Sequence, residues 1–112
     1  MRRGEIYFAE LSPTVGSEIN KRRPALIVSN NANNRAANTV TVVPLTSNVS
    51  PARPFEVLVL ASQTGLPRDS KVLAQQIRTI SKARVAPKKA GELDQELMQQ
   101  VDAAIKLHLA LR

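Results

Sequence analysis

Arg23, which stands directly before Pro24, is the residue in this 112-residue chain best suited to phosphate chemistry. Proline biases its predecessor toward extended backbone, so we expect Arg23 to be held at the start of a strand. Its planar guanidinium could donate two parallel hydrogen bonds to a phosphate. Lys21 and Arg22 come just before it, so the loop Ser12–Arg23 is a candidate polyanion site, with a solvated basic loop as the equally simple alternative.

Thr46 and Ser47 place two hydroxyl groups where the apolar run 40–45 ends. Strand ends often hold functional groups, although local hydrogen bonds that stabilise a turn are the simpler explanation of a Thr-Ser pair. We predict loop and turn positions in the same way for the asparagines Asn30, Asn31, Asn33, Asn34 and Asn38.

Several kinds of catalytic site are excluded by residue type. His108 is the only histidine and there is no cysteine, which excludes a thiol nucleophile and leaves a Ser-His-Asp triad or a zinc site implausible. No glycine pattern makes a nucleotide-binding loop, and we expect neither a metal nor another cofactor. RNA cleavage by the substrate's own 2′-OH needs few protein groups, because that nucleophile is already tethered beside the phosphorus. Arg23 and Thr46 could position the chain and stabilise phosphoryl charge if the fold brings them together.

The charge distribution also points to a polyanionic partner. Residues 1–91 carry fourteen Lys or Arg and five Asp or Glu, whereas residues 92–112 carry two and four. The body is therefore near +9 and the tail is acidic. Only Tyr7, Phe8 and Phe55 are aromatic, which disfavours binding by extensive base stacking. No apolar run is long enough to span a bilayer and no signal core follows Met1, so we expect a cytoplasmic protein without a membrane partner.

The elements that must position these residues are mainly short strands. We predict one domain over residues 1–112, with strands at Glu5–Leu11, Ala25–Ser29, Thr39–Leu45, Phe55–Leu60 and near Lys71–Ile80. The last stretch also fits one side of a helix. As a strand it places Gln76 and Arg78 side by side on one face.

The C-terminal segment predicts an amphipathic helix. Leu93, Leu97, Val101, Ile105 and Leu109 recur every four residues, and Asp94 suits the N-cap. The predicted fold is therefore mainly β with one C-terminal helix, as a small barrel or sandwich plus a packed helix.

Several motifs resemble the MazF/PemK-type toxin endoribonucleases, in the same order over nearly the whole chain. They are Arg3-Gly4-Glu5-Ile6-Tyr7, Ser12-Pro13 through Gly16-Ser17-Glu18, Arg23-Pro24, Pro44-Leu45-Thr46-Ser47, and Asp69-Ser70 through Gln76-Ile77-Arg78-Thr79. Many members have glycine just before the arginine, where this chain has Asn20, Lys21 and Arg22.

The resemblance implies an SH3-like small β-barrel with a terminal helix that forms a homodimer. It implies metal-independent, sequence-specific cleavage of single-stranded RNA, leaving 2′,3′-cyclic phosphate and 5′-OH ends, and neutralisation by an acidic antitoxin. The family's catalytic arginine and threonine fall on Arg23 and Thr46. Arginine is protonated at neutral pH and is therefore a poor base, and Glu18 is the nearest candidate base in the sequence. The family's RNA contacts would fall on Ser17, Glu18, Asn30, Ser47, Ser70, Gln76 and Arg78, and we also assign Lys21, near Arg23, to the RNA groove.

Two other functions are compatible with this pattern. A poison of DNA gyrase of the CcdB type shares the fold, and fold alone does not fix function. A basic module that binds nucleic acid without cutting it would show steeply salt-dependent binding with little sequence preference.

Overall fold

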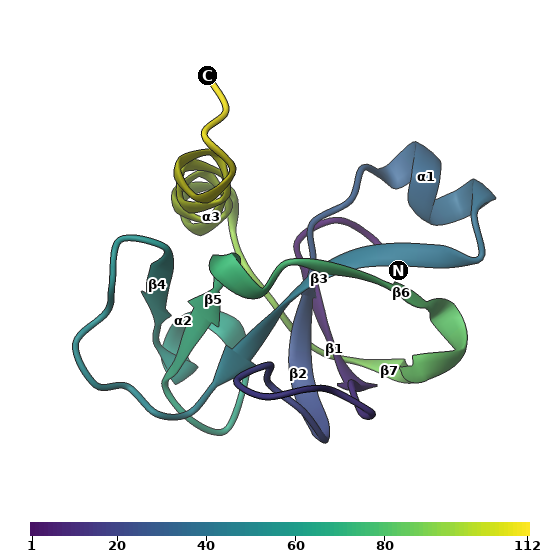
Figure 1. The fold of residues 1–112 in the computed structure, drawn as a ribbon, viewed down its shortest axis with the longest axis horizontal. Helices are drawn as coiled ribbons and strands as arrows, with labels where there is room; N and C mark the ends of the chain where they lie inside the picture. The colour runs from purple at the N-terminus through teal and green to yellow at the C-terminus, as the bar shows by residue number, and fades with distance from the viewer.

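The computed structural model describes all residues, Met1–Arg112, as an antiparallel sheet with one long helix beside it (Figure 1). The strands are β1 (Glu5–Glu10), β2 (Arg22–Ile27), β3 (Thr39–Thr46), β4 (Glu56–Val59), β5 (Ser70–Leu73), β6 (Arg78–Ser81) and β7 (Val85–Glu92). They follow the order β4-β5-β3-β2-β1-β7, with β6 also paired to β3, and the sheet stays open. The prediction of a mainly β, barrel-like fold with a C-terminal helix is confirmed.

The predicted single strand near Lys71–Ile80 is wrong, because the chain breaks there into two strands. A 3-10 turn, η1 (Ala74–Gln76), separates β5 from β6. β5 pairs with the end of β3 at Leu45 and Thr46, whereas β6 pairs with its start at Thr39–Val42. Pro44, between these two stretches, has no amide hydrogen to donate to a ladder. The turn moves the chain from one half of β3 to the other.

Two α-helices and one strand were not expected from the sequence. The asparagine-rich stretch forms α1 (Asn31–Ala36), where Asn30 Oδ1 accepts from the backbone N–H of Asn33 at 2.8 Å. The prediction of turns and loops through 31–36 is therefore wrong, since this cap stabilises a helix. The other two are α2 (Ala61–Thr64) and β7, whose irregular pairing with β1 gives no clean alternation. A second 3-10 turn, η2 (Lys82–Arg84), joins β6 to β7.

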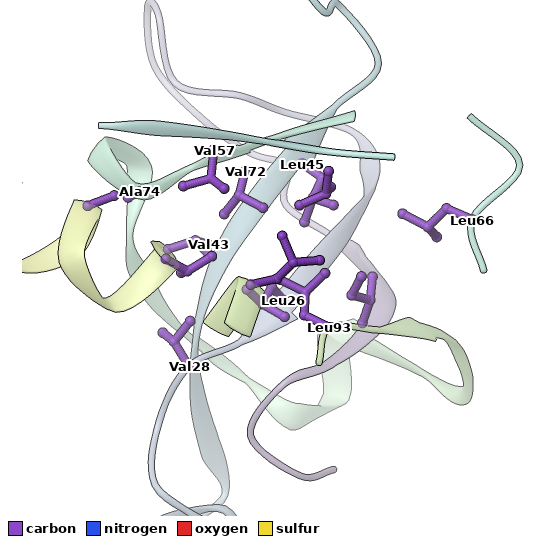
Figure 2. Close-up of a cluster of buried hydrophobic side chains, with 14 residues drawn as sticks. Leu26, Val28, Val43, Leu45, Val57, Leu66, Val72, Ala74 and Leu93 are labelled. Carbon is purple, nitrogen blue, oxygen red and sulfur yellow. The ribbon is translucent and has the colours of Figure 1, made fainter. Parts of the chain in front are cut away.

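Two hydrophobic clusters lie on opposite faces of β1, β2 and β3. Ile6, Leu26 and Val43 belong to the larger cluster, which also includes residues of the C-terminal helix. Figure 2 shows labelled members of this cluster gathered between the strands and a helical segment, with Leu66 reaching in from a separate piece of chain. Tyr7 and Val42, on the alternate positions, belong to the second cluster. Burying both faces fixes the register, because a slip by one residue would exchange the two sets.

The C-terminal helix, α3 (Gln95–Leu109), confirms the predicted element and its cap. Asp94 Oδ1 accepts from the N–H of Leu97 at 2.9 Å, and Leu97 and Val101 are buried. Arg3 joins the helix to the sheet through its ion pair with Asp102. The expected apolar stripe ends early, because Leu109 is 45% exposed. None of the helices has the length and apolar character needed to cross a membrane.

Gly91→Ala is expected to destabilise the protein by about 2 kcal/mol. A Cβ at Gly91 would lie 2.5 Å from the backbone oxygen of Thr64, and a backbone atom cannot rotate away. Urea unfolding measures the loss. Gly16→Ala is the control: its φ of +60° disfavours alanine, but its Cβ would meet no atom within 4 Å, so we expect a smaller loss of about 1 kcal/mol. Unchanged stability of Gly91→Ala would contradict the packing described for β7.

Candidate functional site

Arg23 and Thr46 lie at the neighbouring ends of β2 and β3. The β2–β3 ladder ends with the pair Ala25 and Pro44, and Arg23 and Thr46 lie two residues beyond that pair, one on each strand. Because side chains alternate along a strand, both start from the same face as Ala25 and Pro44. The fold therefore places the two residues expected to carry chemistry at adjoining strand ends.

Both side chains keep unused donors. Arg23 Nε donates to the carbonyl oxygen of Asn20 at 3.1 Å, and its two Nη nitrogens have no partner within the protein. Thr46 Oγ1 accepts from the N–H of Asn48 at 3.2 Å, so its hydroxyl hydrogen remains free. The guanidinium and the hydroxyl can thus both donate to a phosphate oxygen placed between the strand ends.

Thr46 lines a polar hollow of about 490 Å³. This Thr46 hollow is formed by the end of β3, by β4, β5 and η1, and by the β1–β2 and β3–β4 loops. It is lined by Ser17, Ile19, Thr46, Asn48, Ser50, Pro51, Arg53, Glu56, Lys71, Leu73, Gln75 and Gln76. A second hollow, of about 340 Å³ and here called the Arg78 hollow, continues from it and is lined by Ser17, Glu18, Ile19, Gln75, Gln76, Ile77 and Arg78. The two hollows share four residues and form one groove.

The predicted pair Gln76 and Arg78 does lie together in this groove, but both side chains hold the loop between β1 and β2. Gln76 Oε1 accepts from the N–H of Ile19 at 2.6 Å, and its Nε2 donates to the oxygen of Ser17 at 3.4 Å. Arg78 Nη1 donates to the oxygen of Leu11 at 3.1 Å. In this structure, therefore, they build the wall of the groove.

A group of charged residues in the Thr46 hollow was missed by the sequence analysis. Lys71 Nζ lies 3.0 Å from Glu56 Oε1, and both side chains are only 8% exposed. Lys71 is also paired opposite Thr46 in the β3–β5 ladder. The sequence did contain a signal for this site, because Lys71 stands directly beside the apolar run Val72-Leu73-Ala74. A lysine that is buried with such a run needs an oppositely charged partner. The partner itself depends on the β4–β5 pairing and could not be read from spacing.

Glu56 is held ionised by the donors around it. The backbone N–H of Arg53, with Lys71 and Gln75, lowers the pKa of Glu56 to about 2 against the opposing effect of burial. Gln75 Nε2 donates to Glu56 Oε2 at 2.8 Å, and the N–H of Arg53 donates to Oε1 at 3.0 Å. Glu56 is therefore a structural anion and a poor candidate for a base.

Arg23 lines a third hollow, of about 160 Å³, which shares no lining residue with the other two. Here called the Arg23 hollow, it contains two of the predicted RNA contacts, Ser47 and Ser70, together with Arg68. Arg22 lies over the ring of Phe8, with its Cζ 5.2 Å from the ring centroid. Arginines thus line this hollow as well as the groove at Thr46.

Three predicted residues lie at the margin of these hollows or outside them. Glu18 lines the Arg78 hollow, and its Oε1 accepts from the N–H of Val15 at 2.7 Å. Lys21 lines none of the three hollows and has a φ of +66°, a region that favours glycine. Asn30 is used as the cap of α1 and also lies outside them.

Comparison with known proteins identifies the family of this chain. Residues 2–109 match the family model described as PemK-like, MazF-like toxin of type II toxin–antitoxin systems. The chain belongs to this toxin family.

The relatives of this PemK/MazF-like toxin are named as endoribonucleases. Endoribonuclease MazF9 of Mycobacterium tuberculosis is 45% identical, over 99% of this chain and 98% of its own length. Endoribonuclease EndoA of Bacillus subtilis is 43% identical, over 99% and 96%. A solved mycobacterial endoribonuclease in complex with its cognate antitoxin superposes with a TM-score of 0.81 at 29% identity, covering 100% of this chain and 97% of that one. The family model and these relatives confirm the prediction of an endoribonuclease toxin of a toxin–antitoxin system, in preference to a gyrase poison.

Proposed function

We propose that this toxin cleaves single-stranded RNA at a short sequence, with the scissile phosphate bound between Arg23 and Thr46. The observation that carries the proposal is that Arg23 and Thr46 lie at adjoining ends of β2 and β3, each two residues beyond the last pair of the ladder, Ala25 and Pro44. The groove beside them has room for nucleotides, and polar side chains dominate its lining.

In the proposed reaction the 2′-oxygen attacks the adjacent phosphorus as its proton leaves to a base. The bond from phosphorus to the 5′-oxygen breaks, and that oxygen takes up a proton. The products are a 2′,3′-cyclic phosphate and a 5′-OH, and the step needs no metal. Arg23 stabilises the negative charge of the phosphoryl oxygens and donates the proton to the leaving 5′-oxygen, and Thr46 hydrogen-bonds the phosphate.

Glu18 is the proposed base. Glu56 is the other carboxylate that lines the groove, and its two oxygens already accept from Arg53, Lys71 and Gln75. Glu18 is exposed and accepts a single hydrogen bond from the protein. Ser17, Ser47, Ser70, Gln76 and Arg78 line the hollows and are the proposed RNA contacts, with Lys21 and Asn30 at the periphery.

We further propose that the protein acts in the cytoplasm as a homodimer, and that the acidic part of its antitoxin binds the same cationic groove as the RNA. Arg23, Arg53, Arg68 and Arg78 line the three hollows and would attract either ligand.

Incubating the purified protein with a long RNA in excess EDTA tests the activity. We expect cuts at one short motif with 5′-OH ends, mapped by sequencing the fragments. RNA that stays intact would overturn the proposal. Trapping of gyrase on DNA by the same protein would support the gyrase poison, and binding without cutting would support a non-catalytic module.

A further inference from the structure

Two neighbouring glutamines of η1 face the same groove but differ in what their amides contact. Gln76 uses both its oxygen and its nitrogen to hold the backbone of Ile19 and Ser17. Gln75 uses only its nitrogen, which donates to Glu56 Oε2 at 2.8 Å. Gln75 Oε1 is the one buried side-chain oxygen or nitrogen without a hydrogen-bond partner in the structure. A buried acceptor left unpaired costs about 1–3 kcal/mol, which a donor supplied by a ligand would recover.

The orientation of the Gln75 amide is fixed by Glu56. An ionised carboxylate only accepts hydrogen bonds, so the amide nitrogen must face Glu56 and the oxygen must point elsewhere. Lys71 and the N–H of Arg53 hold the carboxylate in place from its other oxygen. Rotating the amide would set its oxygen against Glu56 and lose the 2.8 Å hydrogen bond.

We propose that Gln75 is a specificity-determining residue of this toxin, whose Oε1 accepts a hydrogen bond from an N–H of one RNA base, and that Glu56 and Lys71 are positioning residues for it. The inference rests on the proposed RNA cleavage. Gln75 lines both the Thr46 hollow and the Arg78 hollow, so the recognised base lies in the groove beside the scissile phosphate. A group that accepts from the base favours nucleotides that present a donor at that point and rejects those that present an oxygen.

Because Gln75 Oε1 has almost no accessible surface, a base reaches it only when a residue lining the groove moves. Ser17 and Ile19 line the same two hollows, and Gln76 and Arg78 hold their loop. Entry of the correct base is therefore coupled to a shift of this loop.

The test compares the cleavage rates of wild type and Gln75→Met on RNA with randomised positions around the cut. Methionine keeps the length of the side chain and removes the carbonyl oxygen. We expect Gln75→Met to keep cutting but to lose discrimination by about 10-fold at one nucleotide position, with preferences at the other positions unchanged. Gln99→Met, an exposed glutamine on α3, is the matched control and should keep the wild-type preferences.

A substrate analogue tests whether Gln75 contacts the base N–H directly. At the affected position, replacing the preferred base by an analogue without the N–H should slow wild type about 10-fold and leave Gln75→Met unaffected, as expected for two groups that contact each other. The double variant Glu56→Gln/Lys71→Met removes the ion pair that orients the Gln75 amide but keeps Gln75 itself. It should lose discrimination at the same nucleotide position, so it tests the inference even if Gln75→Met fails to fold.

Wild-type preferences at every position in these variants would overturn the inference, and so would an equal loss of cutting on all sequences by a folded Gln75→Met protein. If wild type itself leaves RNA intact, the proposed function fails instead, so the two failures can be told apart.

Discussion

Replacing Arg23 with alanine is expected to slow RNA cleavage by about 100- to 1,000-fold, the usual effect of removing a donor that stabilises transition-state charge. Arg23 lies at the start of β2, beside the end of β3 that carries Thr46, and its two Nη nitrogens are free to bind phosphoryl oxygens. Alanine removes these donors and the proposed proton donor to the 5′-oxygen. Single-turnover cleavage of a short RNA that contains the mapped motif measures the loss in the chemical step.

Two companion variants identify the cause of that loss. Arg23→Lys keeps the charge but not the planar fork, so we expect partial activity between wild type and alanine. Arg35→Ala removes an exposed arginine of α1, outside the three hollows, and should cut at the wild-type rate. An Arg23→Ala protein that is folded and cuts as fast as wild type would remove Arg23 from the chemistry.

Lys71→Met is expected to destabilise the protein by about 3 kcal/mol, because it leaves the carboxylate of Glu56 buried without its cation. Both side chains of the pair are 8% exposed and lie 3.0 Å apart. Urea unfolding at pH 7 measures the loss. Lys88→Met, at an exposed position in β7, is the control, and we expect it to change the free energy of unfolding by less than about 0.5 kcal/mol. Lys82 is less suitable because its Nζ donates to the backbone oxygen of Asn34. A Lys71→Met protein as stable as wild type would show that the ion pair contributes nothing.

The same pair makes stability depend on pH. Since the native pKa of Glu56 is lowered from 4.5 to about 2, its contribution is full above pH 4.5 and is lost as the pH falls toward 2. The difference corresponds to about 3 kcal/mol. Comparing wild type with Glu56→Gln/Lys71→Met, which lacks both charges, separates the contribution of Glu56 from those of the other carboxylates. The stability of wild type relative to the double variant should fall over this pH range, and a constant difference would contradict the lowered pKa.

The parts of the fold that sequence could predict are those with a clear compositional or periodic signal. The β-branched residues of Thr39–Thr46 suit a strand buried on both faces, the four-residue repeat from Leu93 to Val101 suits a helix buried on one face, and both elements form where expected. The prediction for the stretch from Lys71 to Ile80 was wrong because this stretch pairs with both halves of β3. Periodicity carries no information about which strand is the partner of another. α1 was missed because asparagine favours turns and helix caps alike.

For the site, the sequence located strand ends but not the contacts across the sheet. Arg23 and Thr46 were recognisable because proline and a strand end mark their positions, and the pairing of β2 with β3 places these strand ends next to each other. The ion pair of Lys71 with Glu56 and the free oxygen of Gln75 depend on β4–β5 pairing and on the path of η1. Likewise, Gln76 and Arg78 lie in the groove as predicted, but their use in holding the loop at Ile19 and Leu11 arises from tertiary structure.

The central claim is that the Arg23–Thr46 site uses the RNA's own 2′-OH as the nucleophile. Its most direct test is a short RNA carrying the mapped motif, with a single 2′-deoxynucleotide on the 5′ side of the scissile phosphate. We predict that wild type cuts the all-ribose strand to a 2′,3′-cyclic phosphate and leaves the substituted strand intact, because the nucleophile is missing. Cleavage of the 2′-deoxy strand at the same bond would contradict the mechanism.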